Sequence, residues 1–478
     1  MVEIATNKFS LSRELVCQNI DSNLSVVNPI NCPVDPMYRY WVSHPPFITK
    51  EVKTFQKLEI FRQLFEWSYG YYYQGESEQQ LKRRTPSAGA LYPTEAFLVL
   101  ETEVGWQVLY YHFVSHQFYP VPVQKIDVIV DALGLTKGTE GILLISVLWR
   151  TVQRYGVRGY RYSLLDASHV AFNLVQNLES LGHQIQLTPQ APTLQLQRHL
   201  NLQFGEALVL AFETRLGELN KNKLPPLKLP KLPKIQPNSI EHSPQLCPKL
   251  QRVISFHSKT LKPYFYKTRK LNKGSSVTPQ ELYAYVTKRF SAKGFTGEKV
   301  TLEQYDKIKK VAKSWSPTIP GFLNIIDVYA LTIRVADIPV GLFHLTCQNP
   351  ILNIFGQTEA KFSNRIVEIC QNQLLLQSAA FILIIGVPKS KILNSKHIVY
   401  QNTILNAGFL CSALYQQALR YNLGTTSIGG YSDDDICNLI GDSSLYPIIV
   451  QAFGIPSYSG SKVDAAKIVN PYKKINQV

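Results

Sequence analysis

The sequence predicts an α+β protein built from two fused halves that share one order of elements. The chain has 478 residues, more than one ordinary domain needs. In each half a helix, a strand pair and a buried strand precede a long helix and a last strand. The long helix ends in Leu-Gly in both halves, at Leu181-Gly182 and at Leu423-Gly424. A repeated order of this kind indicates an internal duplication of about 180–200 residues.

The first half is expected over residues 51–216, after an N-terminal extension over 1–50. Apolar residues at helical spacing predict a helix over 52–69. An amphipathic helix is predicted over 165–182, with Gly182 as its C-cap. Four apolar runs predict strands, EAFLVLE at 95–101, GWQVLYYHF at 105–113, GILLISVLW at 141–149 and EALVLAFE at 206–213.

The second half is expected over residues 276–478. It opens with a helix in the run that starts near residue 279, and a long helix is predicted over 403–424. Its predicted strands are IIDVYALTIRV at 325–335, VGLFHL at 340–345, FILIIGV at 381–387 and PIIVQAFGIP at 447–456.

Residues 217–275 are expected to form a basic, Pro-rich linker between the halves. Proline recurs every few residues over 224–237, which favours extended backbone over a helix or a central strand. Most of the formal net charge of +16 lies in residues 221–275, so the rest of the chain has no general basic character. Nucleic-acid binding is therefore not expected. A solvated tether and a docking surface for an acidic partner are both compatible with this segment.

Other broad classes are also disfavoured. No apolar run approaches the roughly 18 residues of a membrane helix, and the N-terminus has no signal-peptide pattern, so no membrane association is expected. The seven Cys residues form no CxxC pair. Neither a disulfide framework nor a metal site is therefore expected, and the reducing cytoplasm is the expected location.

Three short motifs stand out. The first, over residues 85–93, reads TPSAGALYP. The second, over 154–162, reads RYGVRGYRY and is followed by LDASH at 165–169. The third lies in the second half, where RFSAKGF at 289–295 is matched later by SIGGY at 427–431.

Together these motifs resemble the azoline-dehydrogenase branch of the nitroreductase superfamily, which includes the cyanobactin, streptolysin and microcin oxidases. The third motif resembles the opening Arg-x-Ser-x-Arg/Lys motif and the late Gly loop of flavin nitroreductases. The resemblance covers residues 52–215 and 279–457. It implies two nitroreductase-like domains, each a mixed, mainly antiparallel sheet flanked by helices, joined as an intramolecular pseudo-dimer. It also implies FMN as cofactor, and oxidation of thiazoline or oxazoline rings of a ribosomal peptide to thiazoles or oxazoles.

The residue types in these motifs suit FMN, which carries a phosphate, a polar pyrimidine edge and a flat ring. Arg289 and Lys293 bracket Ser291, expected near the start of a helix, where cations can neutralise the phosphate or the edge of reduced flavin. Small residues let backbone approach the ring closely. The other expected flavin-binding residues are Pro86, Ser87, Ala88, Gly89, Ile428, Gly429 and Gly430. Each segment also has a purely structural alternative. Residues 86–93 could form a simple turn, Gly429-Gly430 a helix-to-loop turn, and Arg289 and Lys293 an exposed charged helix face.

In homodimeric relatives each flavin lies between subunits: one subunit gives the Arg-x-Ser-x-Lys segment and the Gly loop, its partner the Pro-Ser loop. Here the first half has the Pro-Ser loop, in the TPSAGALYP motif at 85–93. Where its Gly loop is expected, the sequence reads TPQAPTLQLQRH at 188–199. The second half has the other two motifs, with SPTIPGFLN at 316–324 in place of a Pro-Ser loop. We therefore expect one complete and one decayed site per chain.

Arg154 and Tyr155 are the candidate catalytic residues. The resemblance calls for Lys-Tyr here, to take a proton while a hydride passes to the flavin. Arginine is essentially always protonated, so Arg154 is a poor base and Tyr155 is the better candidate for acid–base work. Packing alone is the alternative role for Tyr155. His169, Tyr160 and Arg161 are further candidates.

The resemblance implies a heterocyclised precursor peptide as substrate, a cyclodehydratase as partner and molecular oxygen as electron acceptor. Two other functions are compatible with the sequence. One is an FMN oxidoreductase of the same superfamily with a small-molecule substrate, which the change to Arg154 favours. The other is a non-catalytic peptide-binding scaffold. The sequence is compatible both with a pseudo-dimer that stays a single chain and with one that pairs with a second copy as a homodimer.

Overall fold

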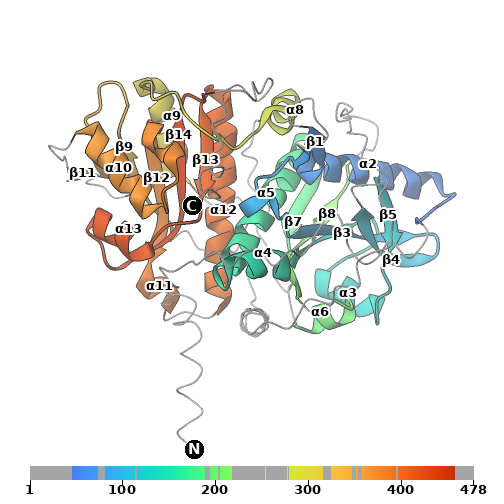
Figure 1. Cartoon of the computed structure of the whole chain (residues 1–478). Helices are drawn as coiled ribbons and strands as arrows, with labels where there is room; N and C mark the ends of the chain where they lie inside the picture. The colour runs from blue at the N-terminus through green and yellow to red at the C-terminus, as the bar shows by residue number, and fades with distance from the viewer. Residues whose placement is uncertain are drawn as a thin grey trace, which may run out of the picture.

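The computed structural model describes residues 46–73, 81–112, 116–188, 194–202, 205–217, 253, 277, 279–315, 325–346, 351–353, 358–393 and 397–457. Most of the N-terminal extension, nearly all of the basic linker and the 316–324 segment lie outside these described residues. The described part contains two six-stranded sheets with helices around them, one in each half, and a small two-stranded sheet (Figure 1).

The first half contains a six-stranded sheet with the order β5-β4-β3-β6-β8-β7. Its strands are β3 (Thr94–Thr102), β4 (Gly105–His112), β5 (Gln117–Pro120), β6 (Glu140–Val147), β7 (Gln184–Leu187) and β8 (Glu206–Arg215). Its helices are α2 (Val52–Tyr69), η2 (Ala88–Ala90), α3 (Ile126–Leu133), α4 (Leu148–Tyr155), α5 (Arg158–Ser180) and α6 (Leu194–His199). A separate hairpin joins β1 (Tyr71–Tyr73) to β2 (Leu81–Arg83).

The second half contains a six-stranded sheet with the order β11-β10-β9-β12-β14-β13. Its strands are β9 (Asp327–Thr332), β10 (Gly341–His344), β11 (Ile351–Asn353), β12 (Phe381–Pro388), β13 (Gly424–Ile428) and β14 (Leu445–Gly454). Its helices are α8 (Pro279–Lys288), α9 (Leu302–Lys313), α10 (Glu359–Ile369), η3 (Leu374–Ser378), α11 (Lys389–Leu393), α12 (His397–Arg420) and α13 (Asp433–Ile440).

The two sheets have the same topology when β3 to β8 are matched in order with β9 to β14. Neighbouring strands pair antiparallel throughout the described part of both sheets. A register irregularity recurs at the matched place, at Leu144/Ile145 between β6 and β8 and at Ile385/Gly386 between β12 and β14. The predicted α+β class, with mainly antiparallel sheets in two like halves, is confirmed.

Several predicted boundaries were wrong. The long helix of the second half runs over His397–Arg420, not over 403–424. Residues 148–149 were expected to end a strand, but Leu148 begins α4, because the backbone leaves the extended conformation at Val147. The long helix of the first half begins at Arg158, not at residue 165, so the second half of the RYGVRGYRY motif is helical. The predicted end of that helix is close to the observed one, since Gly182 has a φ of 75° just beyond it. Glycine adopts this left-handed conformation at low cost.

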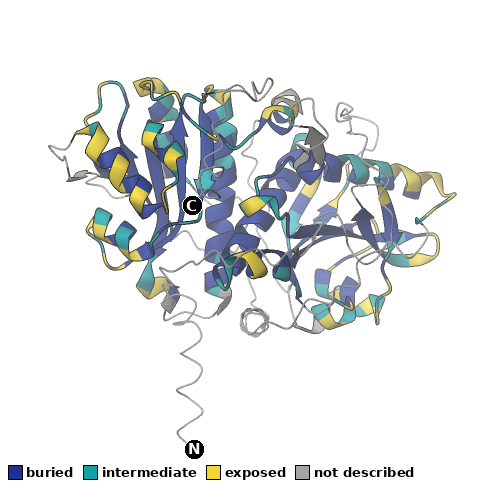
Figure 2. Cartoon of the chain, in the orientation of Figure 1, coloured by how far each residue is buried: buried dark blue, intermediate teal, exposed yellow. Residues whose placement is uncertain are grey.

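Helices α5 and α12 pack against each other between the two sheets (Figure 1). Both are buried along most of their length (Figure 2). One hydrophobic cluster runs through residues of both halves, and Phe172 meets Phe409 with ring centroids 6.1 Å apart. A shared core of this kind makes the halves one body, which confirms the predicted pseudo-dimer. No described helix has the length and apolar character that a membrane crossing requires.

Gly408→Ala is expected to destabilise the chain where α5 and α12 cross. A Cβ atom at position 408 would lie 2.5 Å from the Cβ of Ser168. Alanine normally favours a helix over glycine by up to about 1 kcal/mol, so a loss of stability would come from the crossing. We expect the free energy of unfolding to fall by about 1–3 kcal/mol in chemical denaturation. Adding Ser168→Gly should recover part of the loss, whereas a gain in stability for Gly408→Ala would contradict the close crossing.

Candidate active site

The loop over residues 85–93, here called the Pro-Ser loop, leads from the β1–β2 hairpin into β3. Pro86, Ser87 and Ala88 are half-buried in it. Ser87 Oγ donates a hydrogen bond to Asp166 Oδ2 at 2.5 Å and accepts one from the backbone N–H of residue 92 at 2.9 Å. The Ala88 N–H donates to Asp166 Oδ1 at 3.3 Å. Since Asp166 lies on α5, these bonds fix the loop to the long helix of its own half.

Asp166 was part of a motif in the sequence but was not singled out as a site residue. Its carboxyl is buried, and burial raises its pKa to about 7, although the hydrogen bonds from Ser87 and Ala88 act in the opposite direction. The folded protein therefore holds a proton on Asp166 between about pH 4 and pH 7, where the unfolded chain has released it. This group makes the free energy of unfolding fall as pH rises through that window.

Asp166→Asn is expected to remove that pH dependence, because asparagine does not ionise. Relative to the variant, the free energy of unfolding of the wild type should fall by on the order of 1.4 kcal/mol per pH unit between about pH 5 and 7. Above the pKa of Asp166 it should fall no further. Comparing the two proteins by urea unfolding at pH 5, 7 and 8 cancels the contributions of other titrating groups. A wild-type-to-variant difference that does not change with pH would show that Asp166 is ionised throughout.

Arg154 and Tyr155 end α4 and lie against the Pro-Ser loop. Gly89 has a φ of 61°, and a Cβ atom there would collide with the hydroxyl of Tyr155 and lie 3.2 Å from Nη1 of Arg154. Tyr155 is half-buried and Arg154 is exposed. The guanidinium carbon of Arg154 lies 5.6 Å from the centroid of the Tyr155 ring. The structure thus brings the predicted catalytic pair directly onto the predicted flavin loop.

The Arg-x-Ser-x-Lys segment follows the end of α8, not the start of a helix, so the predicted helical setting was wrong. The backbone leaves the helix at Lys288, and this carries Arg289 toward the first half. Arg289 is buried, its Nε donates to the Arg84 carbonyl at 2.7 Å, and its Nη2 donates to the Arg83 carbonyl at 3.4 Å. Arg289 is therefore not on an exposed helix face. Lys293 is exposed.

Tyr415, on α12, connects this segment to the Gly loop, and sequence reasoning missed it. Its hydroxyl lies 3.1 Å from Ser291 Oγ and accepts a hydrogen bond from the Ser427 N–H at 3.0 Å. His169 packs edge-on against its ring and lies 2.6 Å from Ser412 Oγ through Nδ1. Burial, with a smaller contribution from Arg289, lowers the pKa of His169 to about 3, which favours the neutral form of its ring.

The Gly loop, residues 429–430, follows Ile428 at the end of β13. A Cβ atom at Gly429 would collide with the ring of Tyr162, which belongs to α5 of the first half. Tyr162 in turn meets Tyr155 edge-on, with ring centroids 5.0 Å apart. The Gly430 carbonyl accepts a hydrogen bond from the Gln373 side chain at 3.3 Å.

These contacts form a closed ring through both halves. Arg289 bonds to the Arg83 and Arg84 carbonyls directly before the Pro-Ser loop, and Gly89 within the loop meets Tyr155. From Arg289 the ring continues through Ser291 and Tyr415 to the Gly loop, and from there through Tyr162 back to Tyr155. The predicted split of the motifs between the halves therefore corresponds to one spatial assembly.

The remaining sequence candidates lie in the junction between the halves and not in this ring. Tyr160 is buried and stacks on Tyr400, with ring centroids 6.4 Å apart. Arg161 is buried and donates to the Pro447 carbonyl at 3.2 Å. The segment over 188–199, predicted to stand for the Gly loop of the first half, follows β7 and includes α6. Residues 189–193 and 316–324 are outside the described part, so the decayed second site remains a prediction.

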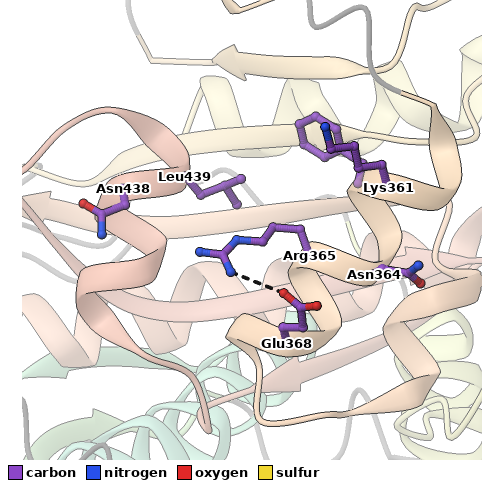
Figure 3. Close-up of a pocket in the computed structure, with 7 residues that line it drawn as sticks. Lys361, Asn364, Arg365, Glu368, Asn438 and Leu439 are labelled. Carbon is purple, nitrogen blue, oxygen red and sulfur yellow. Dashed lines mark hydrogen bonds and ion pairs between the residues drawn. The ribbon is translucent and has the colours of Figure 1, made fainter.

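A separate surface hollow of about 510 Å³ lies between α10 and α13 (Figure 3). Arg365 extends across it and pairs with Glu368 at 3.3 Å and with Asp435 at 3.5 Å. The other lining residues are Lys361, Phe362, Asn364, Asn438 and Leu439. The hollow is formed by the second half alone and contains none of the predicted site residues.

Comparisons with known proteins agree with this architecture. No family model matches the chain. The chain is 30% identical over 115 residues to a protein described as a nitroreductase, MJ1384 of Methanocaldococcus jannaschii; the match covers 23% of this chain and 58% of that protein. The chain thus spans 58% of the length of this curated relative.

Among solved structures, a protein from Anabaena variabilis described as a nitroreductase matches with a TM-score of 0.65 at 19% identity. This match covers 86% of the present chain and 90% of that one. The E. coli microcin synthetase McbBCD complex with truncated pro-MccB17 bound matches with a TM-score of 0.30 at 18% identity, over 38% of this chain and 78% of that one. The Anabaena match extends across both halves, so the fold as a whole has a counterpart.

Proposed function

We propose that this chain, which has a nitroreductase-like fold, is an FMN-dependent oxidoreductase that converts thiazoline or oxazoline rings of a ribosomal peptide to thiazoles or oxazoles. The observation that carries the proposal is the closed ring of contacts. In it, segments of flavin-binding type from both halves meet the Arg154-Tyr155 pair. The substrate would be a heterocyclised precursor peptide supplied by a cyclodehydratase, and molecular oxygen would be the final electron acceptor.

The residues in the ring fit a flavin. Gly89 and Gly429 lie where any side chain would collide with a tyrosine. At these two points of the ring of contacts, the backbone therefore carries no side chain of its own. Lys293, which is exposed, can supply positive charge for a phosphate or for the pyrimidine edge, and the buried Arg289 holds the segment before the Pro-Ser loop. When bound, FMN supplies hydride acceptance, a reaction that side chains do not perform themselves.

Conversion of an azoline to an azole removes two hydrogens from the ring, one as a hydride and one as a proton. We assign the proton to the Tyr155 oxygen at Gly89, which would accept it in the phenolate form, beside the positive charge of Arg154. Arg154 lies at the same place, and its guanidinium suits a substrate carbonyl or carboxylate. Tyr162 and the Pro-Ser loop hold the Tyr155 ring in place.

Mass spectrometry of a heterocyclised peptide incubated with the flavin-loaded protein tests this function. We expect the loss of two hydrogens per azoline ring, and none when the flavin has been removed. If the peptide mass is unchanged while a small-molecule reductant still reduces the flavin, the enzyme is an oxidoreductase with another substrate. That second candidate is favoured by Arg154 in place of lysine. A colourless protein that binds no added FMN would leave only the non-catalytic scaffold.

The division of the motifs predicts one FMN per chain. The first half has no glycine in the segment over 188–199 that stands for its Gly loop, so a second complete ring is not expected. Flavin released from the purified protein should be quantified by absorbance and compared with protein from amino-acid analysis. A ratio near two would contradict the single composite site.

A further inference from the structure

Two buried arginines of α5 reach from the first half into the second. Arg158 and Arg161 are one turn apart on the helix, and their side chains are only 5% and 3% exposed. Arg158 lies over the ring of Tyr431, with its guanidinium carbon 4.5 Å from the centroid. Arg161 donates to the hydroxyl groups of Tyr431 and Tyr446.

A single carboxylate pairs with these two guanidinium groups in the described part of the chain. Asp433 Oδ1 lies 2.8 Å from Arg158 Nη2, and Asp433 Oδ2 lies 3.5 Å from Arg161 Nη2. The Nε atoms of both arginines have no hydrogen-bond partner among the described residues. We call Arg158, Arg161 and Asp433 the arginine clamp. Its formal charge is positive by one unit, in a place where solvent screens little.

Neighbouring phenols do not cancel this excess. Burial raises the pKa of the Tyr162, Tyr431 and Tyr446 hydroxyl groups above the ordinary tyrosine value, although the arginines act in the opposite direction. These groups are therefore neutral at physiological pH, and they face the arginines only as dipoles.

The clamp lies directly behind the Gly loop. Asp433 is the first residue of α13, three positions after Gly430, and Ser432 caps that helix through its side chain. Tyr162, against which Gly429 rests, directly follows Arg161 on the same helix. Whatever fixes Asp433 to α5 therefore fixes the Gly loop to the first half.

We propose that the arginine clamp has two tasks beyond joining the halves: it positions the Gly loop, and its net positive charge favours the reduced, negatively charged form of the flavin. This inference rests on the proposed flavin site. The three residues are positioning residues, since they act through the Gly loop.

The charge of the clamp can be changed in both directions. Asp433→Asn removes its negative charge, and Arg158→Gln removes one positive charge. We expect Asp433→Asn to raise the midpoint potential of the flavin and Arg158→Gln to lower it. A tenfold change in the relative affinity for reduced and oxidised flavin corresponds to about 30 mV for a two-electron couple, and we expect shifts of about that size. Both variants should also bind oxidised FMN more weakly, because the Gly loop is loosened.

Matched controls are available beside the hollow between α10 and α13. Asp435→Asn and Arg365→Gln make the same charge changes at a pair whose side chains are 44% and 50% exposed. Solvent screens these charges, so their potentials should stay near the wild-type value. Arg158→Lys keeps the charge and alters the shape; it should weaken FMN binding while leaving the potential nearly unchanged. If Asp433→Asn fails to fold, Arg158→Gln against Arg158→Lys still separates charge from shape.

FMN titration of the wild type comes first, followed by potentials of all variants against reference dyes. A wild type that binds no FMN overturns the proposed function and this inference together. A wild type that binds FMN, with potentials that shift in the same direction or not at all in the two charge variants, overturns the inference alone. In that case the clamp only joins the halves.

Discussion

Tyr155→Phe is expected to bind FMN as the wild type does and to reduce it about 10²–10⁴-fold more slowly with an azoline peptide. The substitution removes only the hydroxyl, which lies at the Pro-Ser loop near Gly89. The ring remains, so its edge-on contact with Tyr162 is kept. The flavin site should therefore stay assembled while the proton loses its acceptor. Stopped-flow absorbance of the flavin under anaerobic conditions measures the step without interference from oxygen.

Tyr119→Phe is a matched control for this experiment. Tyr119 is buried, lies on β5 at the far edge of the first sheet, and its hydroxyl bonds to Gln117. Its loss should leave the rate of flavin reduction unchanged. An equal rate for Tyr155→Phe and wild type would assign Tyr155 to packing. It would also favour the small-molecule alternative, because the proton acceptor implied for azolines would then be missing.

The fold could be predicted from the sequence because its main signals are local. Buried strands such as 381–387 are continuous apolar runs, and Pro-rich composition marks the boundary between the halves. The site loops were predictable for a related reason: short motifs with small residues mark places where backbone must approach another group. The structure places Gly89 and Gly429 at two such approaches.

The connections between the loops could not be predicted, because they depend on how α5 and α12 cross. Tyr415 lies 124 positions from Ser291 in sequence, and only packing brings their hydroxyl groups together. Asp166 lies 79 positions from Ser87 and looks like one polar residue on an amphipathic helix. That Asp166 holds the Pro-Ser loop is apparent only once its burial and its hydrogen bond with Ser87 are known. The direction of Arg289 was unpredictable for the same reason, since its hydrogen-bond partners are backbone carbonyls of the other half.

The hydrogen bonds from Arg289 to the first half determine the expected effect of replacing it. Arg289→Ala would leave the Arg84 carbonyl, directly before the Pro-Ser loop, without its 2.7 Å donor, and would weaken the attachment of the loop to the second half, where the bond from Arg84 Nη1 to the Val286 carbonyl remains. Hydrogen bonds from a charged donor contribute about 1.5–3 kcal/mol each, so we expect FMN affinity to fall by about 10²-fold or more. The loss should persist in high salt because the bonds are buried. Lys293→Ala, at an exposed position, should weaken binding less, and mainly at low salt.

The double variant Arg289→Ala/Lys293→Ala is expected to be colourless as purified but still folded. Lys288→Ala removes the same charge from the exposed end of α8, next to Arg289, and should keep its flavin. FMN titration at two salt concentrations and thermal unfolding of the apoprotein separate loss of the site from loss of the fold. Full flavin content in the double variant would show that the Arg-x-Ser-x-Lys segment only joins the halves. A cooperative unfolding transition together with lost FMN would place both cations in the flavin site, with Arg289 acting through the Pro-Ser loop and Lys293 through its charge.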